Sequence, residues 1–177
     1  MRGRKRESAL RVAANGRTMD LRQATIRLAR ADEAEAIAIL SRDTIEAGLP
    51  WRWRAPEITR FIQSERHNVI VSPGDAGPMG FAVMSYSERD AYLALLAVAP
   101  VARRTGLARS LLGWLLKTAD IAGITTISVE LREDNLAALR LYEEAGFVEH
   151  NRKAGGYYGR VNQICMRLAL RPPESSI

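Results

Sequence analysis

The chain has little cysteine and histidine, and it lacks long apolar runs. Its single cysteine, Cys165, excludes an intrachain disulfide framework, and with only His67 and His150 beside it we expect no metal site. The longest weakly polar run, residues 91–102, contains Pro100 and is shorter than the roughly 18 residues of a membrane span. Disulfide-stapled, metal-centred and membrane-spanning classes are therefore excluded.

The rest of the composition is that of an ordinary globular protein. The chain has 177 residues, of which 47% are hydrophobic and 26% are charged. A chain of this length can bury a core without disulfides or metals. We predict a basic, disordered tail over residues 1–22, one folded domain over residues 23–171, and a flexible C-terminus over residues 172–177.

The positive charge is concentrated at the N-terminus. Residues 1–22 hold seven basic and two acidic side chains, and so carry +5 of the net charge of +6. Such an arm either is solvated or contacts nucleic acid or an anionic surface, and solvation is the simpler interpretation. The arm lacks the apolar stretch of a secretory signal, and Met19 offers an alternative start. We expect a cytoplasmic monomer or dimer without membrane contact.

Hydrophobic periodicity predicts the order β-α-α-β-β-β-α-β-α-β-β, which is an α/β domain around a mixed sheet. The run from Tyr92 to Val98 is continuously apolar, as expected of a strand buried on both faces. Strands are expected at residues 25–29, 68–72, 79–86, 92–98, 126–131, from 147 and at 162–170, and helices at 32–41, from 56, at about 107–122 and from about 135 to 145.

One motif lies between a predicted strand and a long helix. It reads Arg103-x-x-Gly106-x-Ala108, with Arg104 and Arg109 adding positive charge. The first backbone N–H groups of a helix are unpaired and lie at the positive end of its dipole, so the motif is suited to bind an anion. It lacks the Gly-Lys-Ser/Thr of a Walker loop and the three glycines of a Rossmann turn.

A second motif, from Asn135 to Phe147, reads NLAALRLYEEAGF. With both motifs in this order and spacing, residues 25–170 resemble the GNAT superfamily of N-acetyltransferases. Within it the chain is most similar to bacterial ribosomal-protein-alanine N-acetyltransferases, through LAV at 96–98, RTGLA at 104–108 and VELREDN at 129–135. The resemblance implies one GNAT-type α/β domain, with a mixed, mostly antiparallel sheet and a splayed central strand pair flanked by helices.

The resemblance also implies acetyl-CoA as the acetyl donor. Its pyrophosphate would lie on the loop at 103–108 and its pantetheine arm along the strand at 93–98. The side chain of Asn135 also suits a plain helix N-cap. The residues expected to bind the donor are Leu96, Ala97, Val98, Arg103, Arg104, Gly106, Leu107, Ala108, Arg109 and Asn135.

By the same resemblance Glu130 is the general base and Tyr142 the general acid of a direct transfer. Strand alternation places Glu130 on the side away from Val129 and Leu131, where a carboxylate can take a proton from an amine. Judged from the residues alone, Glu130 also fits an exposed charge on a strand, and Tyr142 also fits a residue of the core. No covalent intermediate is implied, and Cys165 is expected in the core.

The acceptor is expected to be a primary amine, most simply a peptide or protein N-terminal α-amine. Departures from the ribosomal-type pattern are Asn162 and Gln163 in place of Asp-Ala, and a longer, more basic segment around Trp51. Alternatives are a small-molecule amine or lysine acceptor, or a catalytically silent acyl-CoA-binding module. Four aromatic residues are expected to contact the acceptor, although the tryptophans also suit a packed lid: Trp51, Trp53, Tyr157 and Tyr158.

Overall fold

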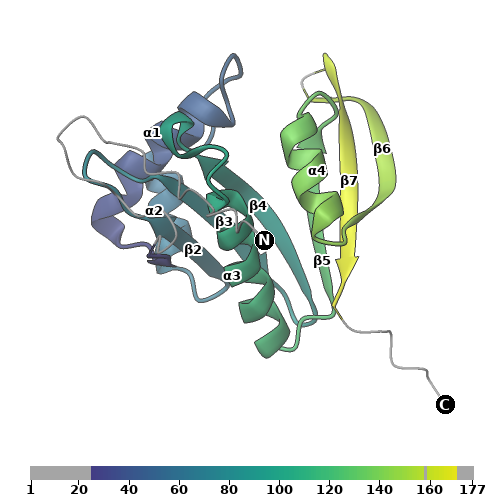
Figure 1. Cartoon of the computed structure of the whole chain (residues 1–177), viewed down its shortest axis with the longest axis horizontal. Helices are drawn as coiled ribbons and strands as arrows, with labels where there is room; N and C mark the ends of the chain where they lie inside the picture. The colour runs from purple at the N-terminus through teal and green to yellow at the C-terminus, as the bar shows by residue number, and fades with distance from the viewer. Residues whose placement is uncertain (1–24, 158, 171–177) are drawn as a thin grey trace, which may run out of the picture.

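The structure is a computed structural model that describes residues 25–157 and 159–170 (Figure 1). The predicted tail and C-terminus therefore lie outside the described residues. The strands are β1 (Arg27–Leu28), β2 (His67–Ser72), β3 (Gly80–Tyr86), β4 (Asp90–Val98), β5 (Thr126–Arg132), β6 (Val148–Tyr157) and β7 (Val161–Ala169). The helices are η2 (Ala31–Glu33), α1 (Ala34–Thr44), α2 (Ala55–Gln63), η3 (Pro100–Ala102), α3 (Leu107–Ile121) and α4 (Leu136–Glu144). This is the predicted order.

The strands form one mixed sheet in the order β1-β2-β3-β4-β5-β7-β6. Neighbouring strands are antiparallel except β4 and β5, which are parallel at the centre. This confirms the predicted α/β class with a mostly antiparallel sheet. Within the described part of the chain, no helix is long and apolar enough to cross a membrane.

Helices cover both faces of the sheet. Residues of α1 and α2, such as Ile37 and Ile58, pack with Phe81 and Leu95 on one face. Residues of α3 and α4 pack on the other face with alternate residues of the central strands, including Met84, Leu93, Leu111, Val129 and Tyr142. Since α1 and α2 pack on β2–β4, they leave the β5–β7 part of their face uncovered (Figure 1).

A β-bulge in β4 decides how the centre of the sheet opens. Leu93 pairs with Met84 and Leu95 with Val83, so Ala94 is an extra residue. The bulge turns Leu93 toward α3 and Leu95 toward α1. The ladder between β4 and β5 ends at Leu93, and beyond it the two strands diverge (Figure 1). The predicted splayed pair is confirmed, and the bulge explains where the splay begins.

The helical segment predicted to start at residue 32 begins at Ala31, and Glu33 fixes this start. Glu33 accepts the N–H of Arg30 at 2.8 Å, and both of its oxygens accept from Arg27 of β1 at 2.8 Å. This attachment to the edge strand starts the helical segment with the 3-10 turn η2. The predicted cap of α4 is confirmed, because Asn135 Oδ1 accepts the N–H of Ala138 at 3.1 Å.

Candidate active site

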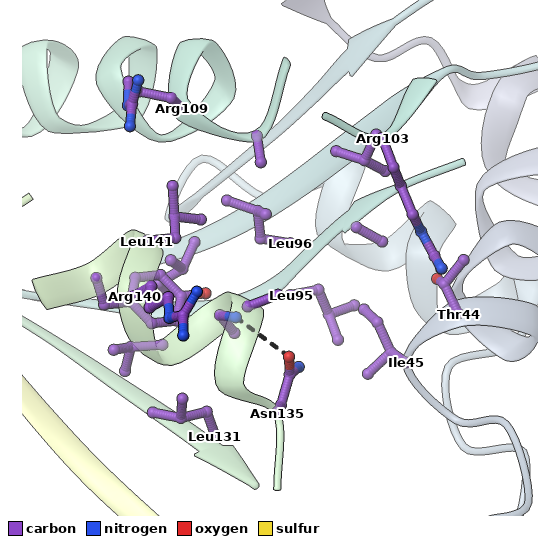
Figure 2. A pocket seen from close by; sticks show the side chains of 18 of the residues that line it. Thr44, Ile45, Leu95, Leu96, Arg103, Arg109, Leu131, Asn135, Arg140 and Leu141 are labelled. Carbon is purple, nitrogen blue, oxygen red and sulfur yellow. Dashed lines mark hydrogen bonds between the residues drawn. The ribbon is translucent and has the colours of Figure 1, made fainter. Parts of the chain in front are cut away.

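A cavity of about 910 Å³ lies where β4 and β5 separate. It reaches from the end of α1, along the second half of β4, to the start of α3, and is closed on the other side by β5 and α4 (Figure 2). All ten residues predicted to bind the donor line it, and so do Glu130 and Tyr142. The β5-facing edge of β4 beyond Leu93 has no strand partner among the described residues, so its backbone can pair with an extended ligand.

The start of α3 provides an anion site with space in front of it. Gly106 is the N-cap at φ +90°, a conformation that favours glycine, and no side chain of the described residues caps this helix end. A Cβ added at Gly106 would meet nothing within 4 Å. The first residues of α3 line the cavity, so the N–H groups that a helix leaves unpaired in its first turn lie beside it. With Arg103, Arg104, Arg109 and Arg140 also lining the cavity, this end fits the phosphates of a CoA donor.

Two of these arginines lie at the rim of the cavity. Figure 2 shows the side chain of Arg103 extending toward Thr44 at the end of α1. Arg109 forms an ion pair with Glu144 of α4, and both side chains are largely exposed. Exposed pairs of this kind are worth about 0–1 kcal/mol, so Arg109 can exchange its partner for a phosphate at little cost.

Glu130 projects from β5 on the sheet face opposite α3 and α4, as strand alternation predicted. Its carboxylate accepts from the hydroxyl of Tyr92 at 3.4 Å and from the Cys165 thiol at 3.8 Å. The ammonium of Lys153 lies 3.7 Å away. Sequence reasoning missed these three neighbours because each lies on a different strand, and only the sheet register brings them to one carboxylate.

The Cys165 thiol is buried, as expected, but it contacts the candidate base. Burial, followed by the negative charge of Glu130, raises the pKa of this thiol. It therefore stays protonated at neutral pH and is a poor nucleophile. This agrees with a transfer that forms no covalent enzyme intermediate.

Tyr142 combines the two roles that the sequence left open. It is only 5% exposed and belongs to the core cluster under α3 and α4, with its ring 5.5 Å from that of Phe147. It also lines the cavity. Glu130 and Tyr142 thus reach the cavity from opposite faces of the sheet, and they can do so because β4 and β5 have separated there.

Trp51 and Trp53, two of the four aromatic residues predicted to contact the acceptor, are not among the residues that line this cavity. Trp51 and Trp53 pack against the cluster under α1 and α2, and arginine guanidinium groups lie 5.0–5.5 Å from their ring centroids. This packing matches the lid interpretation, and contact with an acceptor stays a prediction. Tyr158 and the side chain of Tyr157 lie outside the described residues.

The positions that depart from the ribosomal-type pattern hold the β6–β7 hairpin. The amide of Asn162 bonds Glu133 and the backbone N–H of Gly155. Gln163 is buried against Gly156, where an added Cβ would lie 2.5 Å from Gln163 Cβ. Neither residue is among those that line the cavity, and both side chains are engaged in contacts within the protein.

Comparison with known proteins identifies the family. Residues 27–147 match the acetyltransferase (GNAT) family. The chain belongs to the GNAT family of acetyltransferases. The match runs from β1 to the end of the second motif and includes the start of α3, Glu130 and Tyr142. It confirms the predicted enzyme class, an N-acetyltransferase that takes its acetyl group from acetyl-CoA.

Similar GNAT proteins include ribosomal protein bS18-alanine N-acetyltransferases. Those of Salmonella typhimurium and Escherichia coli K12 are 32% and 36% identical over 111 residues, which cover 61% of this chain and 75% of theirs. The crystal structure of the Escherichia coli ribosomal-protein-S18-alanine N-acetyltransferase is 26% identical, with a TM-score of 0.75 over 86% of this chain and 97% of that chain. A Salmonella typhimurium acetyltransferase structure with acetyl-CoA shares the fold, with a TM-score of 0.71 over 86% of this chain and 98% of that chain at 21% identity.

Proposed function

We propose that this enzyme acetylates the N-terminal α-amine of a peptide or protein, with Glu130 as general base and Tyr142 as general acid. One observation carries the proposal: a carboxylate and a tyrosine line one cavity from opposite faces of the sheet. Beside them lie an open helix N-terminus and a strand edge that has no strand partner among the described residues. The bS18-alanine N-acetyltransferases among its relatives support a protein N-terminus as acceptor.

Each residue has a defined task in the transfer. Glu130 takes a proton from the acceptor ammonium, directly or through one water, so that the neutral amine attacks the thioester carbonyl. Tyr142 gives its hydroxyl proton to the sulfur as the C–S bond breaks. The N–H groups at the start of α3 and the arginines of the cavity hold the donor phosphates.

Proton energetics favour an α-amine. An α-amine has a pKa of about 7.7–8.0, so producing its neutral form at pH 7 costs about 1 kcal/mol. For a lysine side chain with a pKa of about 10.4, the cost is about 4–5 kcal/mol. A single carboxylate in a half-exposed position therefore serves an α-amine more readily than a lysine. A cytoplasmic location, where ribosomal proteins are made, stays a prediction.

The acceptor class is tested by competition with mass-spectrometric readout. A peptide that begins with Ala or Ser is mixed with its N-formylated counterpart, which carries one internal lysine. The α-amine proposal expects the free N-terminus to be acetylated first. Faster acetylation of the blocked peptide contradicts it and favours a lysine or small-amine acceptor.

The catalytic roles are tested with isosteric variants. Glu130→Gln should lower kcat/KM by about 10²–10⁴, the range for a positioned general base, with acetyl-CoA affinity unchanged. Tyr142→Phe should slow turnover more for thioesters with poorer leaving groups. A rate within about threefold of the unmodified enzyme removes Glu130 from the mechanism, because it lies below the general-base range.

A further inference from the structure

A primary amine of the chain itself lies beside the candidate base. The Nζ of Lys153 is 3.7 Å from Glu130 Oε1. Lys153 on β6 pairs with Gln163 of β7, and Glu130 on β5 pairs with Cys165, two residues further along the same strand. Paired residues share a face and residues two apart share a face, so β7 brings the lysine and the carboxylate to the same side of the sheet.

This ion pair holds Lys153 near Glu130 only loosely. The Lys153 side chain is 54% exposed and that of Glu130 is 35% exposed. Pairs of this kind contribute about 0–1 kcal/mol, so the ammonium leaves and returns readily. Its long, flexible stem can carry the nitrogen around the carboxylate, which also lines the cavity where the donor would bind. Tethering makes this encounter unimolecular, which raises the local concentration of the amine at the base.

We propose that Lys153 is a self-acetylation site, acetylated by the acetyl-CoA bound to its own chain. The proposal rests on the role of Glu130 in the proposed function. Glu130 takes one proton from the Lys153 ammonium, and the neutral Nζ attacks the thioester carbonyl carbon. A C–N bond forms and the C–S bond breaks. The electron pair leaves with sulfur, which takes a proton, so the products are acetyl-lysine, CoA thiol and one released proton.

The modification changes the charge at the candidate base. Acetyl-lysine is neutral and cannot form the ion pair. Glu130 Oε1 then loses the internal cation that competes with an acceptor ammonium. Lys153 thus occupies, within the unmodified chain, the position that an acceptor amine needs.

The sequence supplies a matched control for the test. Of the 26 basic residues only three are lysines: Lys5, Lys117 and Lys153. Lys117 is exposed on α3, and within the described residues it forms no ion pair with a carboxylate comparable to that of Lys153. It therefore reports the rate at which acetyl-CoA modifies an accessible lysine without help from the site.

The experiment incubates the full chain with acetyl-CoA and no acceptor, and follows each lysine by peptide mapping with mass spectrometry. Lys153 should be acetylated about 10²-fold faster than Lys117, the lower range of a general-base effect. The rate constant should not depend on protein concentration. Glu130→Gln should remove this advantage, and Lys117→Arg should leave it unchanged. A parallel reaction contains the Ala- or Ser-initiated peptide.

Each result separates the two proposals. Equal rates at Lys153 and Lys117, or a rate constant that rises with protein concentration, overturns self-acetylation within one chain. Acetylated peptide with unmodified Lys153 overturns self-acetylation and leaves the proposed function intact. Acetylated Lys153 with unmodified peptide supports self-acetylation and contradicts the α-amine acceptor. If Glu130→Gln slows neither reaction, Glu130 is not the general base on which both proposals depend.

Discussion

Asn162 of β7 connects two segments beside the cleft by donating to one and accepting from the other. Its Nδ2 donates to Glu133 Oε2 at 2.7 Å, and its Oδ1 accepts the N–H of Gly155 at 3.1 Å. The backbone N–H of Glu133 also donates to the Asn162 carbonyl at 3.0 Å. The loop between β5 and α4 is thereby fixed to the β6–β7 hairpin. An aspartate here could accept from Gly155, but it would place a second carboxylate against Glu133.

Replacing Asn162 by Asp should destabilise the protein in a pH-dependent way. Loss of the donor to Glu133 should cost about 1–3 kcal/mol at pH 7, with charge repulsion added. Protonation of either carboxylate relieves the repulsion, so the folded variant takes up a proton more readily than its unfolded chain. The stability gap to the unmodified protein should therefore narrow as the pH falls. Urea unfolding at pH 7 and pH 5 measures it.

The neutral variant Asn162→Ala provides the control. It loses both side-chain hydrogen bonds, one more than Asn162→Asp, but it adds no charge, so its deficit should change much less over this pH range. Equal pH dependence of the two variants would show that repulsion between the carboxylates at 133 and 162 contributes nothing.

The element order could be predicted from the sequence, but the opening of the sheet could not be located from it. Alternation placed Glu130 on the correct face, because the apolar partners Val129 and Leu131 flank it. Every residue from Tyr92 to Val98 is apolar, which predicted burial on both faces. In the structure Tyr92 is instead exposed, and Ala94, Leu96 and Val98 are half-buried. Because the run is apolar throughout, no change in alternation reveals the bulge at Ala94, which appears only when the register with β3 is known.

Gly106 should be needed both for its backbone conformation and for the space before it. Any other residue at φ +90° should cost about 1–2 kcal/mol of stability. Gly106→Glu also places a carboxylate where phosphates are expected, and should weaken acetyl-CoA binding by about tenfold or more, equal to about 1.4 kcal/mol. Isothermal titration calorimetry measures the affinity of the folded variant.

Gly123 gives a matched comparison at the other end of α3. It has φ +80°, and a Cβ added there would also meet nothing within 4 Å, but it does not line the cavity. Gly123→Glu should lose a similar amount of stability and keep its acetyl-CoA affinity. If Gly106→Glu binds as tightly as Gly123→Glu, the phosphates lie elsewhere.

Glu33 should make stability depend on acid pH. Two hydrogen bonds from the Arg27 guanidinium, helped by the N–H of Arg30, lower the pKa of Glu33 to about 2. A carboxyl whose pKa is lower in the folded state than in the unfolded chain stabilises the fold at pH values above its unfolded-state pKa. This stabilisation is lost as the pH falls toward 2. Glu33→Gln should therefore be clearly less stable at pH 7 and approach the unmodified protein near pH 3. Denaturant unfolding at both pH values measures this.

The exposed neighbour Glu35 serves as the control for that series. It lies in the first turn of α1, and Glu35→Gln should change stability by less than about 0.5 kcal/mol at pH 7. An equal loss in both variants would assign the effect to the overall negative charge of this segment and not to the Arg27–Glu33 pair.

The neighbours of the candidate base show the limit of sequence reasoning at the site. Motifs indicated Glu130 and Tyr142 because the two residues lie only twelve positions apart within a recognisable pattern. Lys153 belongs to no motif, and its approach to Glu130 depends on register shifts in the pairing of β6 with β7. Such a contact follows from the whole sheet, so no local pattern predicts it.

The buried carboxylate of Glu46 fixes the segment that follows α1 beside the cavity, and through it should influence binding of the acceptor. Glu46 is 6% exposed, and its Oε1 accepts the backbone N–H of Arg52 at 2.6 Å and that of Trp53 at 3.3 Å. Its neighbours Ile45 and Ala47 line the cavity. Glu46→Ala should cost about 1–3 kcal/mol, because it leaves these donors without their acceptor. As the segment loosens, the KM for the acceptor should rise while acetyl-CoA affinity stays unchanged.

Glu46→Gln keeps an oxygen that can accept from Arg52 and should retain most of the stability and the low KM, as urea unfolding and initial-rate kinetics would show. If Glu46→Gln were as impaired as Glu46→Ala, the negative charge and not the hydrogen bonds would hold this segment in place.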